Sequence, residues 1–407
     1  MAVGVLACLG GLVPAVAAEL ERSNYIVQLR AEPLATGLAR QGKLDTASPE
    51  AVDYRRRLDD LEVRALRMAG IDDDFVGYRY RTTLAGFSAR LTAAQAERLG
   101  RLPGVAAVTA DRIRSFRRER PQTFDDPEVQ DRVDPAAVAP HRAAPHQVAA
   151  TTVADTDLSG HPAEFLGLPD GLWARLGGPD HAGEGVVIGV IDSGIYPEHP
   201  SFADTPVAPD GTRNYIGPAY DAPPATWKGT CQEGENFPAT SCNNKLIGAR
   251  YLVDGFGAAK VEERDFLSPR DAEGHGTSVA SVAAGNYGVD PSYLGNDLGI
   301  GVISGIAPRA RIAAYKAVWA IPILGGGVGS DSDIVAAIDA AVADGVDVIN
   351  LSFGGVIDTL GPFSNPSVLL EPLALALLGA FDAGIPAVLP AGNDGPDEST
   401  VDSPAFA

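Results

Sequence analysis

The second half of the chain alternates short apolar runs with longer stretches of helical periodicity. Four mostly apolar runs predict strands: 186–191, 311–318, 346–352 and 386–390. The stretches between them predict helices: 275–283, 331–344 and 369–383. Strands that are apolar throughout are covered on both faces. From Gly185 onward the pattern therefore predicts a doubly wound, mostly parallel α/β domain, in which binding and catalysis gather at the carboxyl ends of the strands.

The clearest predicted helix is 331–344. Its apolar residues recur at the helical period, and its sequence carries start and stop signals. Ser332 is a candidate N-cap, and Gly345 is expected to end the helix.

Residues 24–116 show a different pattern, typical of a small α+β module. The pattern predicts strands at 24–29, 83–91 and 105–108 and helices at 49–68 and 93–99. The predicted order is β-α-β-α-β. Residues 117–150 are rich in Pro, Ala and charge without a period, so they predict an exposed linker open to proteolysis. The α/β domain is assigned to residues 151–407.

The first 18 residues are almost wholly apolar and end in small residues, Ala15-Val16-Ala17-Ala18. This is typical of a secretory signal peptide, so we expect a secreted protein with no membrane span after removal of the leader. No Lys or Arg precedes the apolar stretch. A buried N-terminal helix therefore stays open as an alternative.

The three cysteines also bear on whether the protein is secreted. Cys8 lies in the leader, whereas Cys231 and Cys242 form a pair in a loop rich in Gly, Asn and Pro. In an exported protein such a pair favours a disulfide that closes the loop. Two free buried thiols are the alternative.

The net charge of −21 argues against nucleic acid as a partner, because an acidic protein gains nothing from releasing the counterions of a phosphate backbone. The net charge also differs in sign between the two parts of the chain. Residues 1–120 hold 19 basic and 15 acidic residues, whereas residues 121–407 hold 13 basic and 38 acidic ones. The two parts have opposite net charge and could attract each other, although solvated surface charge without a role explains the same counts.

Polar residues follow several predicted strands. Asp192 follows the first, His275 begins a helix between two glycines, and Asn393 follows the last. Each alone is also typical of a cap or a turn. Together at one sheet edge they favour hydrolysis by an activated nucleophile, since an imidazole accepts the proton, a carboxylate fixes its tautomer and an amide stabilises an oxyanion.

These residues stand in motifs that resemble those of the subtilisin-like serine proteases. Residues 190–195 resemble the family's catalytic aspartate motif, residues 274–277 its histidine motif, and residues 390–393 its oxyanion-hole motif. Residues 24–116 resemble the family's inhibitory propeptide of the I9 type. Similarity to the cucumisin-like branch lies in residues 229–231, 242–250 and 305–310.

The resemblance implies a role for each of these residues. His275 would be the general base, Asp192 would orient it, and Asn393 would hold the oxyanion. The substrate backbone would pair with the strand edge at Ser352, Phe353 and Gly354.

It also implies a secreted endopeptidase zymogen that hydrolyses proteins or peptides and carries its propeptide as an intramolecular inhibitor. The propeptide would be cleaved between residues 117 and 152. No cofactor is implied. Calcium, which family members often bind, stays unassigned because the acidic residues show no ligand spacing.

The chain departs from the family pattern at the nucleophile. The family's serine lies in a Gly-Thr-Ser-Met motif downstream of the oxyanion asparagine, and no such motif follows Asn393. The sequence Gly276-Thr277-Ser278-Val279 only mimics it, because it belongs to the helix that His275 begins; Ser278 stands where the family commonly has a second histidine. We therefore expect this chain to be C-terminally incomplete and inactive as it stands.

Two other classes of function stay open. A catalytically inactive, subtilase-like binding protein would keep the cleft and the propeptide without a nucleophile. A nucleotide-dependent α/β enzyme would use residues 183–185 and Asp192, but no glycine-rich turn follows the first strand to hold a phosphate.

Overall fold

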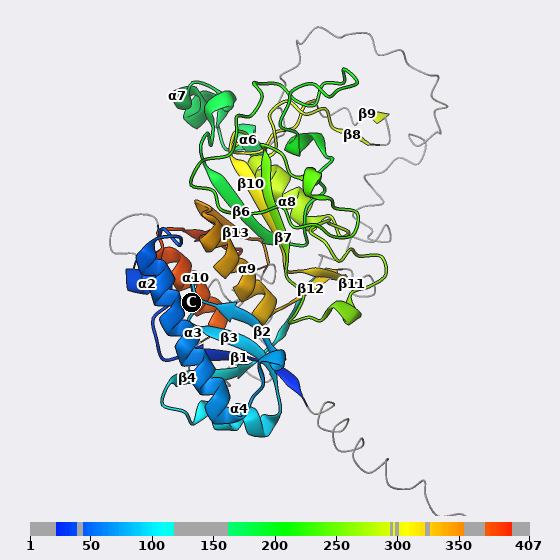
Figure 1. The fold of residues 1–407 in the computed structure, drawn as a ribbon. Coiled ribbons are helices and arrows are strands. Elements are labelled where there is room, and N and C mark those ends of the chain that lie inside the picture. Colours follow the sequence, from blue (N-terminus) through cyan, green and yellow to red (C-terminus); the bar gives the residue numbers. More distant parts are fainter. Residues whose placement is uncertain are drawn as a thin grey trace, which may run out of the picture.

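An N-terminal antiparallel module packs against a larger domain built around a parallel sheet (Figure 1). This computed structural model describes residues 22–38, 44–117, 162–293, 296–297, 301–321, 326–353 and 371–392. The predicted leader with Cys8, nearly all of the predicted linker, Gly354 and Asn393 lie outside the described residues.

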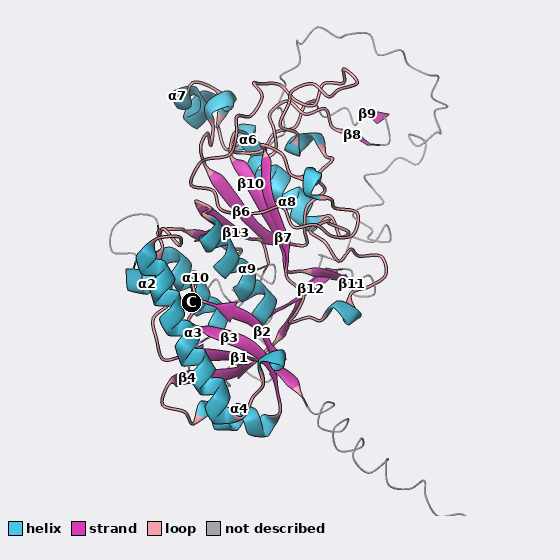
Figure 2. Ribbon diagram, viewed as in Figure 1, coloured by secondary structure: helices cyan, strands magenta, loops and turns pink. Residues whose placement is uncertain are grey.

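The N-terminal module is a four-stranded antiparallel sheet in the order β2-β3-β1-β4. Its strands are β1 (Ser23–Leu29), β2 (Val76–Tyr80), β3 (Gly86–Leu91) and β4 (Val105–Ala110), and its helices are α2 (Leu34–Leu38), α3 (Pro49–Ala69) and α4 (Ala93–Gly100). Val27 and Phe87 of the sheet are buried in one core with Leu58 and Leu99 of the helices. The helices therefore cover one face of the sheet (Figure 2).

Helix α3 begins and ends where the sequence supplies caps. The Ser48 side chain accepts a hydrogen bond from Ala51 N at 3.2 Å, and Pro49 occupies the first turn, where no backbone donor is needed. Gly70 closes the helix in the left-handed conformation at φ 66°.

The predicted order β-α-β-α-β was wrong, because the module also contains α2 and β2. Strand β2 reads Val-Gly-Tyr-Arg-Tyr, so a glycine and a charged residue occupy the positions between its apolar ones. Arg79 is accommodated by an ion pair with Glu62 of α3, at 2.9 Å. This alternation is the period-2 pattern of a half-buried strand, so β2 carries a local signal that the predicted order left out.

The larger domain has a five-stranded parallel sheet in the order β14-β13-β6-β10-β7, which confirms the predicted doubly wound fold. The strands are β6 (Val187–Asp192), β7 (Leu246–Tyr251), β10 (Arg311–Lys316), β13 (Val348–Leu351) and β14 (Ala387–Val388), and the main helices are α8 (His275–Ala284), α9 (Asp331–Asp344) and α10 (Pro372–Asp382).

Successive residues of the central strands supply two different cores. Ile191 and Tyr315 pack in one core with the helices α9 and α10, whereas Val190 and Ala314 pack in a second core with Ala280 of α8. Because side chains alternate across a strand, a sheet with helices on both faces needs apolar residues at every position. This explains the unbroken apolar runs in the sequence.

Helix α9 spans the predicted residues, but its N-cap is Ser330, not Ser332. Ser330 Oγ accepts a hydrogen bond from Asp333 N at 3.1 Å. Ser332 lies inside the first turn, where its backbone N–H is taken by Asp111 of the N-terminal module at 2.9 Å. Gly345 ends the helix at φ 95°, as expected.

The predicted disulfide joins Cys231 and Cys242, whose Cα atoms are 6.0 Å apart, so the alternative of two free thiols was wrong. Further short elements are α6 (Pro162–Phe165), α7 (Ala174–Leu176), β8 (Ser292–Tyr293) and β9 (Asn296–Asp297). Within the described residues, no helix combines the length and apolar character that a membrane crossing requires.

One strand leaves the N-terminal module and pairs with the larger domain. β5 (Ile113–Arg117) lies antiparallel to β12 (Gly326–Ser330), which also pairs with β11 (Trp319–Ile321). Ser330 of β12 lies opposite Ile113, directly before α9 begins. The two modules are therefore joined by a small three-stranded sheet, β11-β12-β5, as well as by side chains.

Candidate active site

Asp192 is the last residue of β6, and its carboxylate is 2 % exposed. Oδ1 accepts a hydrogen bond from Ser193 N at 2.7 Å. Gly194 then turns the chain at φ 115°, so closely against the neighbouring loop that a Cβ atom would lie 2.5 Å from Pro269 O. Only glycine fits this turn.

His275 is the first residue of α8, after Gly274 in the left-handed conformation at φ 93°. His275 Nδ1 lies 2.8 Å from Asp192 Oδ1, and the imidazole is 49 % exposed. Gly276 allows this approach, because a Cβ atom there would lie 2.4 Å from Gly194 O. The ring is thus held by a buried carboxylate on one nitrogen and faces outward with the other.

The two groups perturb each other's titration. Burial raises the pKa of the Asp192 carboxyl, while the hydrogen bond with His275 opposes that rise. The same hydrogen bond raises the pKa of His275, against the effect of burial. Asp192 Oδ2 is buried and has no hydrogen-bond partner among the described residues.

The structure places only part of the predicted substrate edge. Leu351 pairs with Ile191, so Ser352 follows at the same strand end as Asp192. Ser352 Oγ accepts a hydrogen bond from Asn350 Nδ2 at 2.8 Å. Phe353 as a whole residue is 5 % exposed and packs in the same core as Ile191, so little of its side chain or backbone is accessible.

Strand β5 pairs in extended conformation with the edge of β12. The sequence did not predict β12. β5 pairs with it over five residues, from Ile113 opposite Ser330 to Arg117 opposite Gly326. The Arg114 guanidinium forms ion pairs with Asp331 and with Glu371. A β-strand added to a free edge in this way is a general mode of peptide recognition.

A carboxylate of α9 anchors the N-terminal module. Asp339 accepts hydrogen bonds from the backbone N–H groups of Arg81 at 3.3 Å, Thr82 at 2.8 Å and Thr83 at 2.7 Å, and from Thr83 Oγ1 at 3.1 Å. These three donor residues are buried. Burial raises the pKa of Asp339, and the hydrogen bonds oppose that rise.

A second contact to α9 has its carboxylate on the N-terminal module instead of on the helix. Asp111 accepts hydrogen bonds from Ser332 N at 2.9 Å and from Ser332 Oγ at 2.6 Å, at the N-terminal end of α9. Burial and the nearby carboxylates of Asp331 and Asp333 raise the pKa of Asp111 to about 7, against the effect of its hydrogen bonds.

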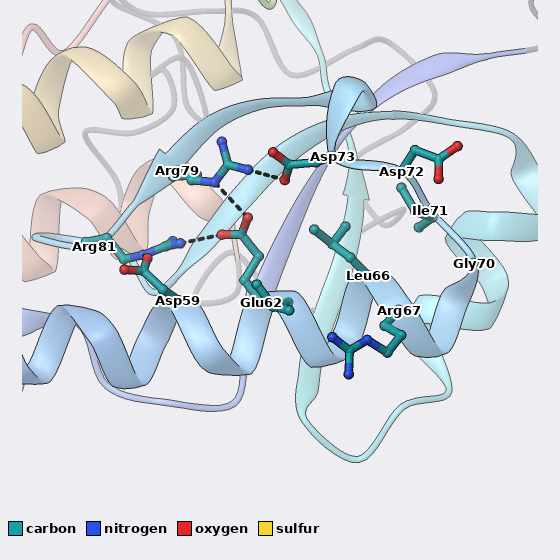
Figure 3. Close-up of a pocket in the computed structure, with 11 residues that line it drawn as sticks. Asp59, Glu62, Leu66, Arg67, Gly70, Ile71, Asp72, Asp73, Arg79 and Arg81 are labelled. Carbon is teal, nitrogen blue, oxygen red and sulfur yellow. Dashed lines mark hydrogen bonds and ion pairs between the residues drawn. The ribbon is translucent and has the colours of Figure 1, made fainter.

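An open hollow of about 780 Å³ lies within the N-terminal module, between α3 and β2 (Figure 3). Part of its charged lining is paired: Arg79 contacts Glu62, and Arg81 contacts both Glu62 and Asp59. The Arg81 guanidinium also donates to the carbonyls of Tyr80 at 2.9 Å and Gly86 at 2.8 Å. The ion pairs therefore brace the turn that presents its N–H groups to Asp339.

Comparison with known proteins identifies the family. Residues 183–407 match the subtilase family, and residues 24–117 match peptidase inhibitor I9. The chain belongs to the subtilase family of serine proteases, and its N-terminal module is an I9 domain.

Three relatives from Arabidopsis thaliana illustrate the match. Subtilisin-like protease SBT3.3 is 38 % identical over 81 % of this chain and 35 % of its own length, and SBT2.6 is 35 % identical over 93 % and 40 %. SBT2.1 is 45 % identical over 60 % of this chain and 27 % of its own length. The chain thus spans well under half the length of these relatives.

Proposed function

We propose that this chain is the propeptide and the Asp/His part of a secreted serine endopeptidase zymogen. The observation that carries the proposal is the 2.8 Å contact between His275 Nδ1 and Asp192 Oδ1, with a buried carboxylate and an outward-facing ring. A carboxylate on Nδ1 selects the tautomer whose Nε2 lone pair is free. Nε2 then accepts the proton of a hydroxyl nucleophile, and Asp192 stabilises the imidazolium that forms.

Side chains alone carry this reaction, and no cofactor is proposed. Asn393 is proposed to donate its amide to the tetrahedral oxyanion, a contact that lowers such barriers by about 3–4 kcal/mol. The nucleophilic serine is proposed to come from sequence outside these 407 residues, because the Gly-Thr-Ser motif at 276–278 is part of the histidine helix.

The I9 domain is proposed to inhibit the enzyme within the same molecule. Strand β5 fills the edge of β12, where a substrate backbone would otherwise pair, and Asp339 fixes the rest of the domain to α9. The chain between β5 and the larger domain would then be cut during maturation, between residues 117 and 152.

Export is proposed from two features. The first 18 residues have the composition of a signal peptide, and Cys231 and Cys242 form a disulfide, a bond that persists in oxidising compartments. Extracellular protein or peptide substrates follow from the family and from this location.

The test is autocatalytic maturation of the full-length protein carrying His275→Ala. We expect the propeptide to stay covalently attached, measured by gel mobility and by sequencing of the N-terminus. His181→Ala is the matched control. The His181 side chain is exposed, and its imidazole pairs with the exposed carboxylate of Glu184. Maturation of the His275 variant at the rate of the unmodified protein would overturn the assignment of His275 as the base.

A further inference from the structure

A second carboxylate lies beneath the Asp192–His275 pair. Asp271 is four residues before His275 in the chain, and only 9 % of its surface is exposed. Five donors converge on it. Oδ1 accepts from Ser193 Oγ at 3.0 Å, Glu273 N at 3.0 Å and Gly274 N at 2.8 Å, and Oδ2 accepts from Thr277 N at 2.9 Å and Thr277 Oγ1 at 2.5 Å.

These donors flank both members of the pair. Ser193 follows Asp192, and its own N–H holds the Asp192 carboxylate at 2.7 Å. Ser193 Oγ also accepts from Gly276 N at 2.8 Å, so it links the strand end to the first turn of α8. Thr277 Oγ1 accepts from Tyr196 N at 3.0 Å, which makes a second link between the same two segments.

The loop that carries Asp271 is itself fixed to the sheet. Lys316 of β10 is fully buried, and its Nζ donates to Arg270 O at 2.7 Å and to Asp265 Oδ1 at 2.5 Å. Lys316 lies opposite Asp192 in the parallel pairing of β10 with β6. Asp271 is therefore attached to a rigid support on the strand next to Asp192.

We propose that Asp271 is a positioning residue, which sets the distance and orientation between Asp192 and His275 by holding the β6 end and the α8 N-terminus together. Its catalytic consequence rests on the proposed function, but the geometry does not. Every hydrogen-bond partner described for the Asp271 side chain is a donor, so a carboxylate satisfies all five. An asparagine has only one acceptor oxygen, so its NH₂ group would face the donors that one of the two carboxylate oxygens now accepts from.

The variant Asp271→Asn in the full-length protein tests this. We expect kcat to fall about 10- to 100-fold with KM within about twofold, because the loss is one of orientation at the reacting centre. Glu263→Gln is the matched control: it removes the same charge from an exposed residue of the same segment and should change neither constant.

The pKa and the Nδ1–H resonance of the His275 imidazole supply a readout. A purely structural role of Asp271 would leave both unchanged. The charged groups described as facing His275 are Asp192 of β6 and Asp271 and Glu273 of the preceding loop, and all three raise its pKa. In Asp271→Asn the acid limb of the kcat/KM profile should therefore move to lower pH, and the Nδ1–H proton resonance of His275 should shift or broaden.

The inference is overturned if Asp271→Asn keeps the unmodified kcat, or if kcat falls while the pH limb and the His275 resonance are unchanged. Should the variant fail to fold, Ser193→Ala replaces it, since it removes two hydrogen bonds, the one to Asp271 and the one from Gly276 N, and leaves the other four donors to Asp271 in place; an unchanged kcat and resonance there overturn the inference equally. If the unmodified protein has no peptidase activity, the proposed function fails, and the His275 resonance alone decides the role of Asp271.

Discussion

The contact between Asp339 and the I9 domain should dominate how firmly the two modules hold together. In Asp339→Ala, the N–H groups of Arg81, Thr82 and Thr83 lose their acceptor in a buried setting. Truncating one partner of a hydrogen-bonded buried charge costs about 2–5 kcal/mol. Since each 1.4 kcal/mol is a factor of ten, these amides should exchange with solvent about 30- to several thousand-fold faster.

Hydrogen exchange followed by mass spectrometry measures this on the peptide that contains residues 81–83. Asp382→Ala is the control at the same interface, because Asp382 accepts from Thr36 Oγ1 at 2.7 Å in an exposed position. An exposed contact contributes about 1 kcal/mol or less, so exchange near Thr36 should rise less than about tenfold.

The reasoning would be refuted if Asp339→Ala left exchange at residues 81–83 within twofold of the unmodified protein. It would also be refuted if the Asp382 variant had the larger effect, since burial would then not decide the strength of these contacts.

Three further outcomes are expected. The pKa of Asp111 is raised to about 7 from 3.8, so docking of the I9 domain gains from its protonation and weakens as the pH rises from about 4 to 7; Asp111→Asn should reduce this dependence in hydrogen exchange, leaving the part that Asp339 and the other buried carboxylates of α9 contribute. Replacing Cys231 and Cys242 by serine should lower the free energy of unfolding by about 2–4 kcal/mol in denaturant titration, because an 11-residue separation is no longer closed. Asp192→Asn should lower the pKa of His275 in an NMR titration, since the hydrogen bond to Asp192 is the main cause of its rise; an unchanged pKa would contradict the geometry of the pair.

Four of the five strands of the parallel sheet could be predicted because their sequence signal is local, whereas β7 was not predicted. Residues 187–192 and 311–316 are buried at every position. A strand covered on both faces has mostly apolar residues in sequence, and this run can be recognised without knowledge of distant segments. Helix α9 likewise ends at a glycine in the conformation that glycine favours.

Strand β12 could not be predicted in this way. Its residues are Gly-Gly-Val-Gly-Ser, a composition that is unfavourable for a strand, and it is extended between two partners, β11 of its own domain and β5 of the N-terminal module. The predicted order of the N-terminal module was wrong for a different reason, because β2 does alternate apolar with polar positions and was overlooked.

The candidate site was predictable in part. Asp192 and His275 stand in motifs, and the structure brings them together. Asp271 and Asp339 were missed because their sequence looks like that of any acidic residue in a loop or on a helix. What distinguishes them is the number of donors that converge on each carboxylate, which depends on segments distant in the chain.

The pairing of β5 with β12 has a consequence for mass action. Because both strands belong to one polypeptide, the concentration of the blocking strand near its edge is set by the covalent connection and does not change when the protein is diluted. A single cut after β5 would turn the same contacts into an ordinary bimolecular equilibrium. Dilution would then empty the edge, although the contact surface of each partner would be unchanged.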